Sequence, residues 1–271
     1  MSTLTSDALG VYPIAPTPFF DDGRIDTASI DRLTDFYLSC GATGITVLGQ
    51  LGEAPKLEHE ESLAVATQMI RRAAQLPVVV GVSAPGFAAM RALTREVMDR
   101  GAAGVMIAPP NTLRTDDQIV GYYQQAVEAI GADVPFVLQD YPLTFSVQMT
   151  PGVIRRIVEA LPSCTMLKHE DWPGLEKIST LRGWERDGSM RRVSILCGNG
   201  GLFLDFETGR GAARGPLVVP HPSRPPVSLS PLTRRTEAGR RGRHEGRTRR
   251  HRHDQRREGD RHDEARGRGV H

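Results

Sequence analysis

A lysine at the end of an apolar run is the residue of this chain most suited to covalent chemistry. The run from Cys164 to Leu167 is typical of a buried strand, and Lys168 follows it directly. Burial disfavours the ammonium form of lysine, and a neutral amine attacks ketones to form a Schiff base. A lysine at a strand end can equally extend its ammonium group into water. The choice between a catalytic and a surface role for Lys168 therefore depends on what the surrounding residues indicate.

Three further apolar runs are followed by residues that could serve the same site. The paired glycines in the turn from Gly49 to Glu53 let the backbone turn sharply and expose amide groups that can hold a carboxylate. Tyr141 offers a hydroxyl that can transfer a proton. The glycines around Asn199 let the backbone approach a ligand closely. Each segment alone also suits an ordinary loop or a packing tyrosine, so the hypothesis depends on their shared position after strands.

The elements that must position these residues alternate regularly along the chain. The apolar runs predicted as strands are 11–19, 44–48, 77–82, 104–108, 135–138, 165–168 and 193–197. The amphipathic stretches predicted as helices are 26–38, 58–74, 87–100, 115–130, 151–160 and 175–186. This alternation predicts a parallel sheet with helical crossovers, and the near-continuous apolar strands predict burial on both faces.

We expect the sheet to close into a (β/α)8 TIM barrel. The first strand is not followed by Gly-x-Gly-x-x-Gly, the fingerprint of open dinucleotide-binding sheets. Barrel enzymes place their chemistry at the carboxyl ends of strands, which is where Lys168, Tyr141 and the Gly49 turn fall. The barrel domain is predicted over residues 1–213, with an eighth unit that is defective or missing.

The last part of the chain differs sharply in composition. The formal charge is −7 up to residue 213 and +9 from 214 to 271, which sum to the net charge of +2. The segment 214–271 is rich in arginine and poor in apolar residues, which predicts disorder. It could bind nucleic acid through phosphates, but from 215 onward it lacks Phe, Tyr and Trp for base stacking. We favour a frameshift near Ala212, since off-frame reading of GC-rich DNA yields such residues.

The cysteines and the N-terminus indicate a cytoplasmic protein. Cys40, Cys164 and Cys197 lie in or beside apolar runs without metal-ligand spacing, so they are predicted to be reduced core residues. The first residues lack the layout of a signal peptide. No apolar run approaches the roughly 20 residues that span a bilayer. We therefore expect neither a membrane partner nor a metal.

The motifs together resemble the dihydrodipicolinate synthase / N-acetylneuraminate lyase family of class I aldolases. The resemblance rests on Pro13 to Phe19, on Gly-x-x-Gly-Glu at Gly49 to Glu53, on Tyr141 and on Lys168, and it extends from about Gly10 to Gly211. It implies a (β/α)8 barrel with a C-terminal helical extension, usually a homotetramer, and no metal or organic cofactor.

The resemblance also implies a role for each candidate residue. Lys168 corresponds to the Schiff-base lysine and Tyr141 to the tyrosine that transfers protons. The backbone amides around Gln50 and Leu51 correspond to the group that binds the carboxylate of a 2-oxo acid. We expect Glu53 to support this turn rather than to act as a catalytic acid.

The departures from the family pattern argue against the lysine-pathway reaction. Synthases proper carry two threonines where this chain has Gln50 and Leu51, and an arginine where it has Ser146. The tyrosine that a neighbouring subunit lends is absent from the loop 109–111. These differences favour a lyase or dehydratase for a 2-keto-3-deoxy sugar acid, with Gln50, Asp140 and Asn199 as candidates to bind hydroxyls. A structural role is an equal alternative for Asp140. The alternatives are 4-hydroxy-tetrahydrodipicolinate synthase proper, an inactive truncated barrel, and a nucleic-acid binder.

Overall fold

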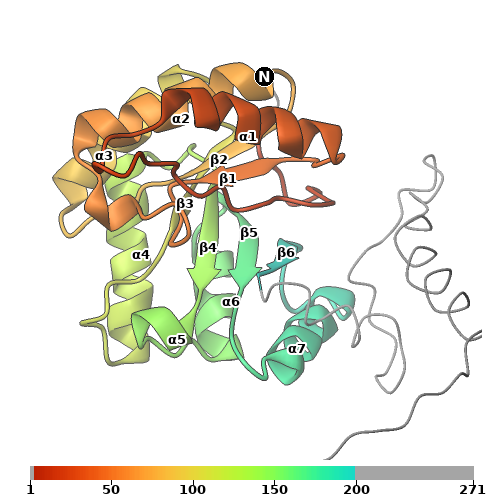
Figure 1. The fold of residues 1–271 in the computed structure, drawn as a ribbon. Coiled ribbons are helices and arrows are strands. Elements are labelled where there is room, and N and C mark those ends of the chain that lie inside the picture. Colours follow the sequence, from red (N-terminus) through yellow and green to blue (C-terminus); the bar gives the residue numbers. More distant parts are fainter. Residues whose placement is uncertain (1–2, 199–271) are drawn as a thin grey trace, which may run out of the picture. The chain divides into compact units, whose positions relative to one another are not determined.

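The computed structural model describes residues 3–198, which form a curved parallel sheet covered by helices (Figure 1). Within these residues the strands are β1 Ile45–Val47, β2 Val78–Gly81, β3 Gly104–Ile107, β4 Phe136–Asp140, β5 Cys164–His169 and β6 Ser194–Cys197. They lie side by side in chain order, and every neighbouring pair is parallel. The predicted parallel α/β architecture is therefore confirmed as a half-barrel. The part of the chain where a defective or missing eighth unit was predicted, and the segment 214–271 with its predicted disorder, lie outside the described residues.

The helices follow the predicted amphipathic stretches closely. They are α1 Thr27–Ser39, α2 His59–Ala73, α3 Phe87–Asp99, α4 Asp116–Ile130, α6 Pro151–Ala160 and α7 Leu175–Arg186. Side-chain caps explain where several of them begin: Asp26 caps α1, Thr150 caps α6, and Thr115 forms a capping box with Gln118 at α4. Two short elements were not predicted, the 3-10 helix η1 Ala54–Lys56 and the helix α5 Pro142–Phe145.

The first predicted strand, residues 11–19, is not a regular strand. Its contact with β1 is an isolated parallel bridge between Ile14 and Thr46, where the Ala15 amide donates to the Thr46 carbonyl and the Thr46 amide to that of Pro13. Prolines at 13, 16 and 18 have no N–H to donate, so a continuous ladder cannot form. The segment nevertheless occupies the place beside β1 that the prediction assigned to it.

The sheet separates two apolar layers. The larger one lies between the strands and the helices, and it includes Val80, Ile107 and Leu138. The smaller one lines the inner face of the sheet, to which β2 to β5 contribute Val79, Met106, Val137 and Met166. Leu4 and Tyr12 from the N-terminal segment complete the inner layer. Both faces of the sheet are thus buried, as the apolar strands predicted.

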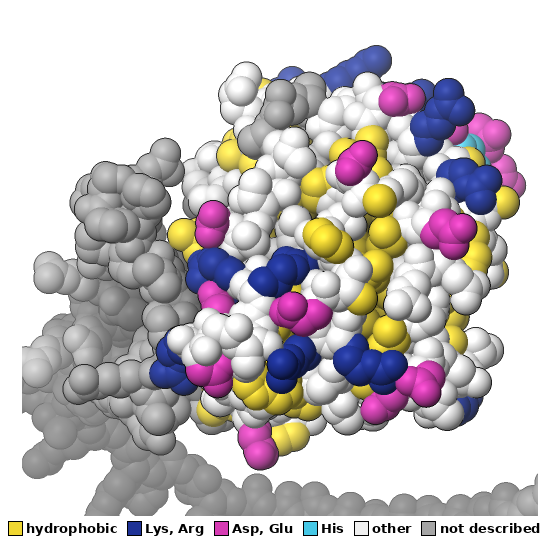
Figure 2. Space-filling view, turned by 180° about the vertical axis from the view of Figure 1, so that it is seen from behind, with side chains coloured by type: hydrophobic (Ala, Val, Ile, Leu, Met, Phe, Trp, Pro, Cys, Tyr) yellow, Lys and Arg dark blue, Asp and Glu magenta, His cyan; other side chains and the backbone are white. Residues whose placement is uncertain are grey.

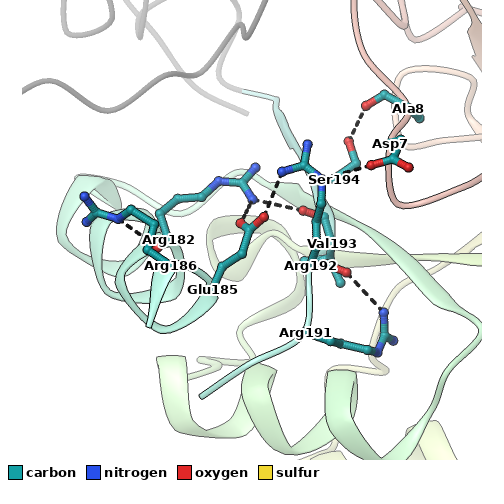
Figure 3. Close-up of polar contacts among 9 residues, drawn as sticks. All are labelled: Asp7, Ala8, Arg182, Glu185, Arg186, Arg191, Arg192, Val193 and Ser194. Carbon is teal, nitrogen blue, oxygen red and sulfur yellow. Dashed lines mark hydrogen bonds and ion pairs between the residues drawn. The ribbon is translucent and has the colours of Figure 1, made fainter. Parts of the chain in front are cut away.

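The N-terminal segment is tied to β6 and α7 by polar contacts (Figure 3). The Ser194 hydroxyl donates to the Ala8 carbonyl at 2.7 Å, and Arg192 Nε lies 3.1 Å from a carboxylate oxygen of Asp7. The same guanidinium reaches Glu185 of α7 at 2.8 Å. These contacts bring the start of the chain to the last described strand.

Acidic and basic side chains are mixed on the surface of the described residues. Ion pairs join α2 to α1 through Arg72 and Asp35 at 2.6 Å, and α6 to α4 through Arg156 and Asp117 at 2.7 Å. On the face shown in Figure 2, blue and magenta side chains are interspersed, so this face offers no continuous basic surface for phosphates. Within residues 3–198, no helix has the length and apolar character needed to span a membrane.

Candidate active site

Lys168 lies near the carboxyl end of β5, with its side chain only 3% exposed. Lys168 and Met166 are two residues apart on the strand, so both side chains lie on the inner face of the sheet. The register places Lys168 opposite Gln139 of β4. Its Nζ atom is 3.2 Å from Oε1 of Glu170, and Gln139 donates to the other oxygen of Glu170 at 2.8 Å. The three side chains form a buried polar cluster, which we call the Lys168 cluster.

The Lys168 cluster adds a charged neighbour to the setting expected for the lysine. The apolar run predicted a buried amine that readily loses its proton, and the structure pairs this amine with a buried carboxylate. Glu170 was not among the predicted site residues. The available signal was its spacing, because residues two apart on an extended segment point to the same side. Gly198 packs against Glu170, and a Cβ atom built at that position would lie 2.4 Å from its Cγ.

Tyr141 follows β4 directly, at the same end of the sheet as Lys168. The Glu170 amide donates to the Asp140 carbonyl at 2.8 Å, which continues the pairing of β4 with β5 up to this point. The ring of Tyr141 packs edge-on against Phe145, with 6.1 Å between ring centroids. Its hydroxyl makes no hydrogen bond with another described residue. The tyrosine therefore keeps a hydroxyl at this edge of the sheet that is not engaged elsewhere within residues 3–198.

The turn after β1 has a constrained backbone. Leu48 and Glu53 adopt left-handed conformations, with φ of 58° and 56°, which is unusual for residues other than glycine. Gly81 of β2 permits this path, since a Cβ atom there would lie 2.0 Å from the Leu48 carbonyl oxygen. The Thr17 hydroxyl donates to the Gly52 carbonyl at 2.6 Å and holds the turn from the other side.

Two amides of the Gly49 turn remain available to a ligand. Hydrogen bonds inside the turn engage the amides of Gly52 and Glu53. Those of Gln50 and Leu51 donate to no acceptor in the described part of the chain, and both residues are exposed. The Glu53 side chain is partly exposed and pairs with Lys56 at 2.5 Å. Its contact is therefore local to the turn, and it does not extend to the Lys168 cluster.

Asp140 does not face the Lys168 cluster, so of the two roles predicted for it the structure favours the structural one over binding of substrate hydroxyls. It alternates with Gln139 along β4 and lies opposite His169 on the outer side of the sheet. One of its oxygens is 3.0 Å from His169 Nδ1 and 2.8 Å from Lys177 Nζ of α7. Lys177 also contacts Asp171 at 2.7 Å. These residues form the Asp140 network, which ties the ends of β4 and β5 to α7.

The remaining predicted residues have different outcomes. Asn199 and the glycines after it lie outside the described residues. Ser146 is exposed after α5. Cys164 is buried as predicted, and burial raises the pKa of its thiol to about 12, which keeps it protonated and unreactive. Cys40 was predicted to be a core residue but is exposed at the end of α1.

Comparison with known proteins identifies the family. The model of the dihydrodipicolinate synthetase family matches residues 7–182, more than half of the chain. The chain therefore belongs to this family, which confirms the resemblance drawn from Lys168, Tyr141 and the Gly49 turn.

Individual relatives agree with this assignment. The dihydrodipicolinate synthase from Rhodopseudomonas palustris, whose crystal structure is known, is 69% identical in sequence to this chain. The two structures match with a TM-score of 0.75, and the match covers 78% of this chain and 70% of that one. The 4-hydroxy-tetrahydrodipicolinate synthase of Shewanella sp. (strain W3-18-1) is 31% identical over 68% of this chain and 58% of its own length. That of Methanothrix thermoacetophila is 29% identical over 55% of this chain and 50% of its own length. The chain thus spans about half the length of the curated relatives it matches.

Proposed function

We propose that the chain is a lyase that forms a Schiff base between Lys168 and a 2-oxo acid. The observation that carries this proposal is the position of Lys168, a buried amine at the carboxyl edge of the parallel sheet in a member of the dihydrodipicolinate synthetase family. The carboxyl edge is where barrel enzymes hold their catalytic groups. Tyr141 and the Gly49 turn follow strands of the same sheet at this edge, which supports a common site.

The groups at this edge suit the chemistry of an imine. The amine of Lys168 condenses with the ketone, and the resulting iminium cation withdraws electrons from the neighbouring carbon. That carbon can then lose a proton, break a carbon–carbon bond or expel hydroxide. Tyr141 would transfer the proton, while the amides of Gln50 and Leu51 anchor the carboxylate and orient the substrate.

Trapping of the imine tests the proposal directly. The full chain is incubated with pyruvate and borohydride, and its peptides are analysed by mass spectrometry. We expect a stable adduct on Lys168 and none in a Lys168→Ala variant. Lys56 is an exposed lysine and serves as the matched control, so a Lys56→Ala variant should be labelled like the wild type. No adduct on the wild type with pyruvate or any 2-keto-3-deoxy sugar acid would refute the proposal.

For the substrate, we favour a 2-keto-3-deoxy sugar acid over the aldehyde used by the synthases. Gln50, Leu51 and Ser146 replace the threonines and the arginine that the resemblance associates with the synthase reaction. The names of the relatives favour the alternative, 4-hydroxy-tetrahydrodipicolinate synthase. Turnover assays that compare aspartate semialdehyde plus pyruvate with a panel of sugar acids decide between the two.

A further inference from the structure

Glu170 has the position of a reacting group rather than of a surface counter-ion. Its Oε1 atom is 3.2 Å from Lys168 Nζ, and both side chains are almost fully buried. Among the described residues, no other carboxylate forms an ion pair with this lysine. Gln139 donates to the second oxygen of Glu170 at 2.8 Å, and the backbone at Gly198 packs against its side chain. The carboxylate is thus held in one orientation, with one oxygen directed at the amine.

The proposed reaction requires a proton acceptor at this place. An ammonium group cannot attack a ketone, so Lys168 must release a proton before the carbon–nitrogen bond forms. A carboxylate can accept that proton, and the described residues place the carboxylate of Glu170 3.2 Å from Nζ of Lys168.

We infer that Glu170 is a catalytic residue that moves the protons of Schiff-base formation at Lys168, an inference that rests on the proposed function. Glu170 first accepts a proton from the ammonium group. The free amine attacks the ketone carbon, and the protonated carboxyl returns the proton to the ketone oxygen, which becomes a hydroxyl. Glu170 then takes a proton from the nitrogen and delivers it to the departing hydroxyl, which leaves as water. Ammonium and ketone have become iminium and water, and Glu170 is again a carboxylate.

The inference also assigns Gln139 a supporting part. Gln139 contacts Glu170 and not the amine, so it acts as a positioning residue for the carboxylate. It lies opposite Lys168 in the β4–β5 register, which fixes the spacing between the two strands at the cluster. Gln139 therefore ties the carboxylate of Glu170 to β4, the strand that lies next to Lys168 in the sheet.

The test measures the rate of imine trapping in a Glu170→Gln variant of the full chain. Glutamine keeps the size of the side chain but cannot accept the proton. We expect labelling of Lys168 by pyruvate and borohydride to slow on the order of 10²-fold at neutral pH, the lower range for general acid–base catalysis. The deficit should shrink as the pH is raised, because hydroxide then takes the proton. Glu170→Asp retains a carboxylate, so its labelling rate should lie between those of the wild type and of Glu170→Gln.

The controls separate this inference from the proposed function and from a folding defect. Glu128→Gln, at an exposed position of α4, should label like the wild type. Recovery of the rate at higher pH marks a chemical defect, since a misfolded site would not recover. If the wild type is labelled and Glu170→Gln is labelled equally fast or faster at neutral pH, the inference fails while the proposed function stands. If the wild type itself gives no adduct, both fail.

Discussion

Asp140 carries a buried negative charge whose two oxygens have different surroundings. One oxygen contacts His169 and Lys177, while the other has no hydrogen-bond partner among the described residues. The network anchors the outer side of β4 and β5 next to the Lys168 cluster on the inner side. A buried ion pair contributes little beyond its desolvation cost, but removal of one partner leaves the other charge uncompensated.

At the scale of single residues, Asp140→Asn should therefore destabilise the fold. We expect a loss of about 3 kcal/mol, because Asp171 is then the one charged partner that the described residues leave to the ammonium of Lys177. Asp117→Asn is the matched control. Its side chain is 86% exposed in its pair with Arg156, so the expected loss is below about 1 kcal/mol. Urea denaturation of the two variants measures both values, and equal losses would contradict this account of the network.

Among the elements, the N-terminal segment has the most unexpected position. Leu4 is only 3% exposed and belongs to the inner apolar layer of the sheet. Its amide donates to the Ala103 carbonyl at 2.8 Å, just before β3. Gly104 allows this packing, since a Cβ atom there would lie 3.3 Å from Leu4 Cβ and 2.8 Å from the Pro135 carbonyl oxygen. The segment thus fills space inside the curved sheet.

We expect Leu4→Ala to cost about 2–5 kcal/mol, the range for a buried leucine that leaves a cavity. Leu9 lies five residues later and is 41% exposed, so Leu9→Ala should change stability by less than about 1 kcal/mol. The measurement is the difference in the denaturant midpoint between each variant and the wild type. A Leu4→Ala protein as stable as Leu9→Ala would show that the inner layer does not depend on the N-terminal segment.

At the scale of the whole molecule, cysteine and tyrosine side chains whose pKa is raised by burial predict that the fold loses stability at alkaline pH. Burial raises the pKa of the Cys164 thiol from 9.0 to about 12 and that of the Tyr122 hydroxyl from 10.0 to about 12. Burial also raises the pKa of Tyr123 well above its usual value. In each case the unfolded chain releases its proton at a lower pH than the folded chain does. These groups therefore contribute stability below about pH 9, which is lost as the pH rises toward 12.

We expect the free energy of unfolding to fall by a few kcal/mol over this alkaline range, as measured by urea midpoints at successive pH values. Tyr122→Phe removes one of the ionisable groups, so this variant should lose less stability between pH 10 and pH 12 than the wild type does. A stability that is constant over this range in the wild type would contradict the burial of these side chains.

Assembly also belongs to this scale and stays a prediction. The resemblance implies a homotetramer, and sedimentation of the full chain tests it. The predicted boundary between residues 213 and 214 and the frameshift near Ala212 are likewise untested, and translation of the other reading frames of the coding DNA addresses them.

The sequence by itself determined the order of the elements and the family. Apolar runs and amphipathic periodicity are local properties, so the strands and helices could be predicted within a few residues. Lys168 and Tyr141 could be proposed because the ends of parallel strands share one edge. The prediction of a regular strand over 11–19 was wrong, although the apolar pattern is that of a strand. Its prolines interrupt the ladder of hydrogen bonds to β1.

The tertiary structure alone decided which side chains meet. The pairing of Glu170 with Lys168, the outward position of Asp140 and the burial of Leu4 depend on strand register and on contacts between distant segments. A one-residue shift of register would exchange the two faces of a strand, and no local pattern specifies that shift for strands that are apolar on both faces.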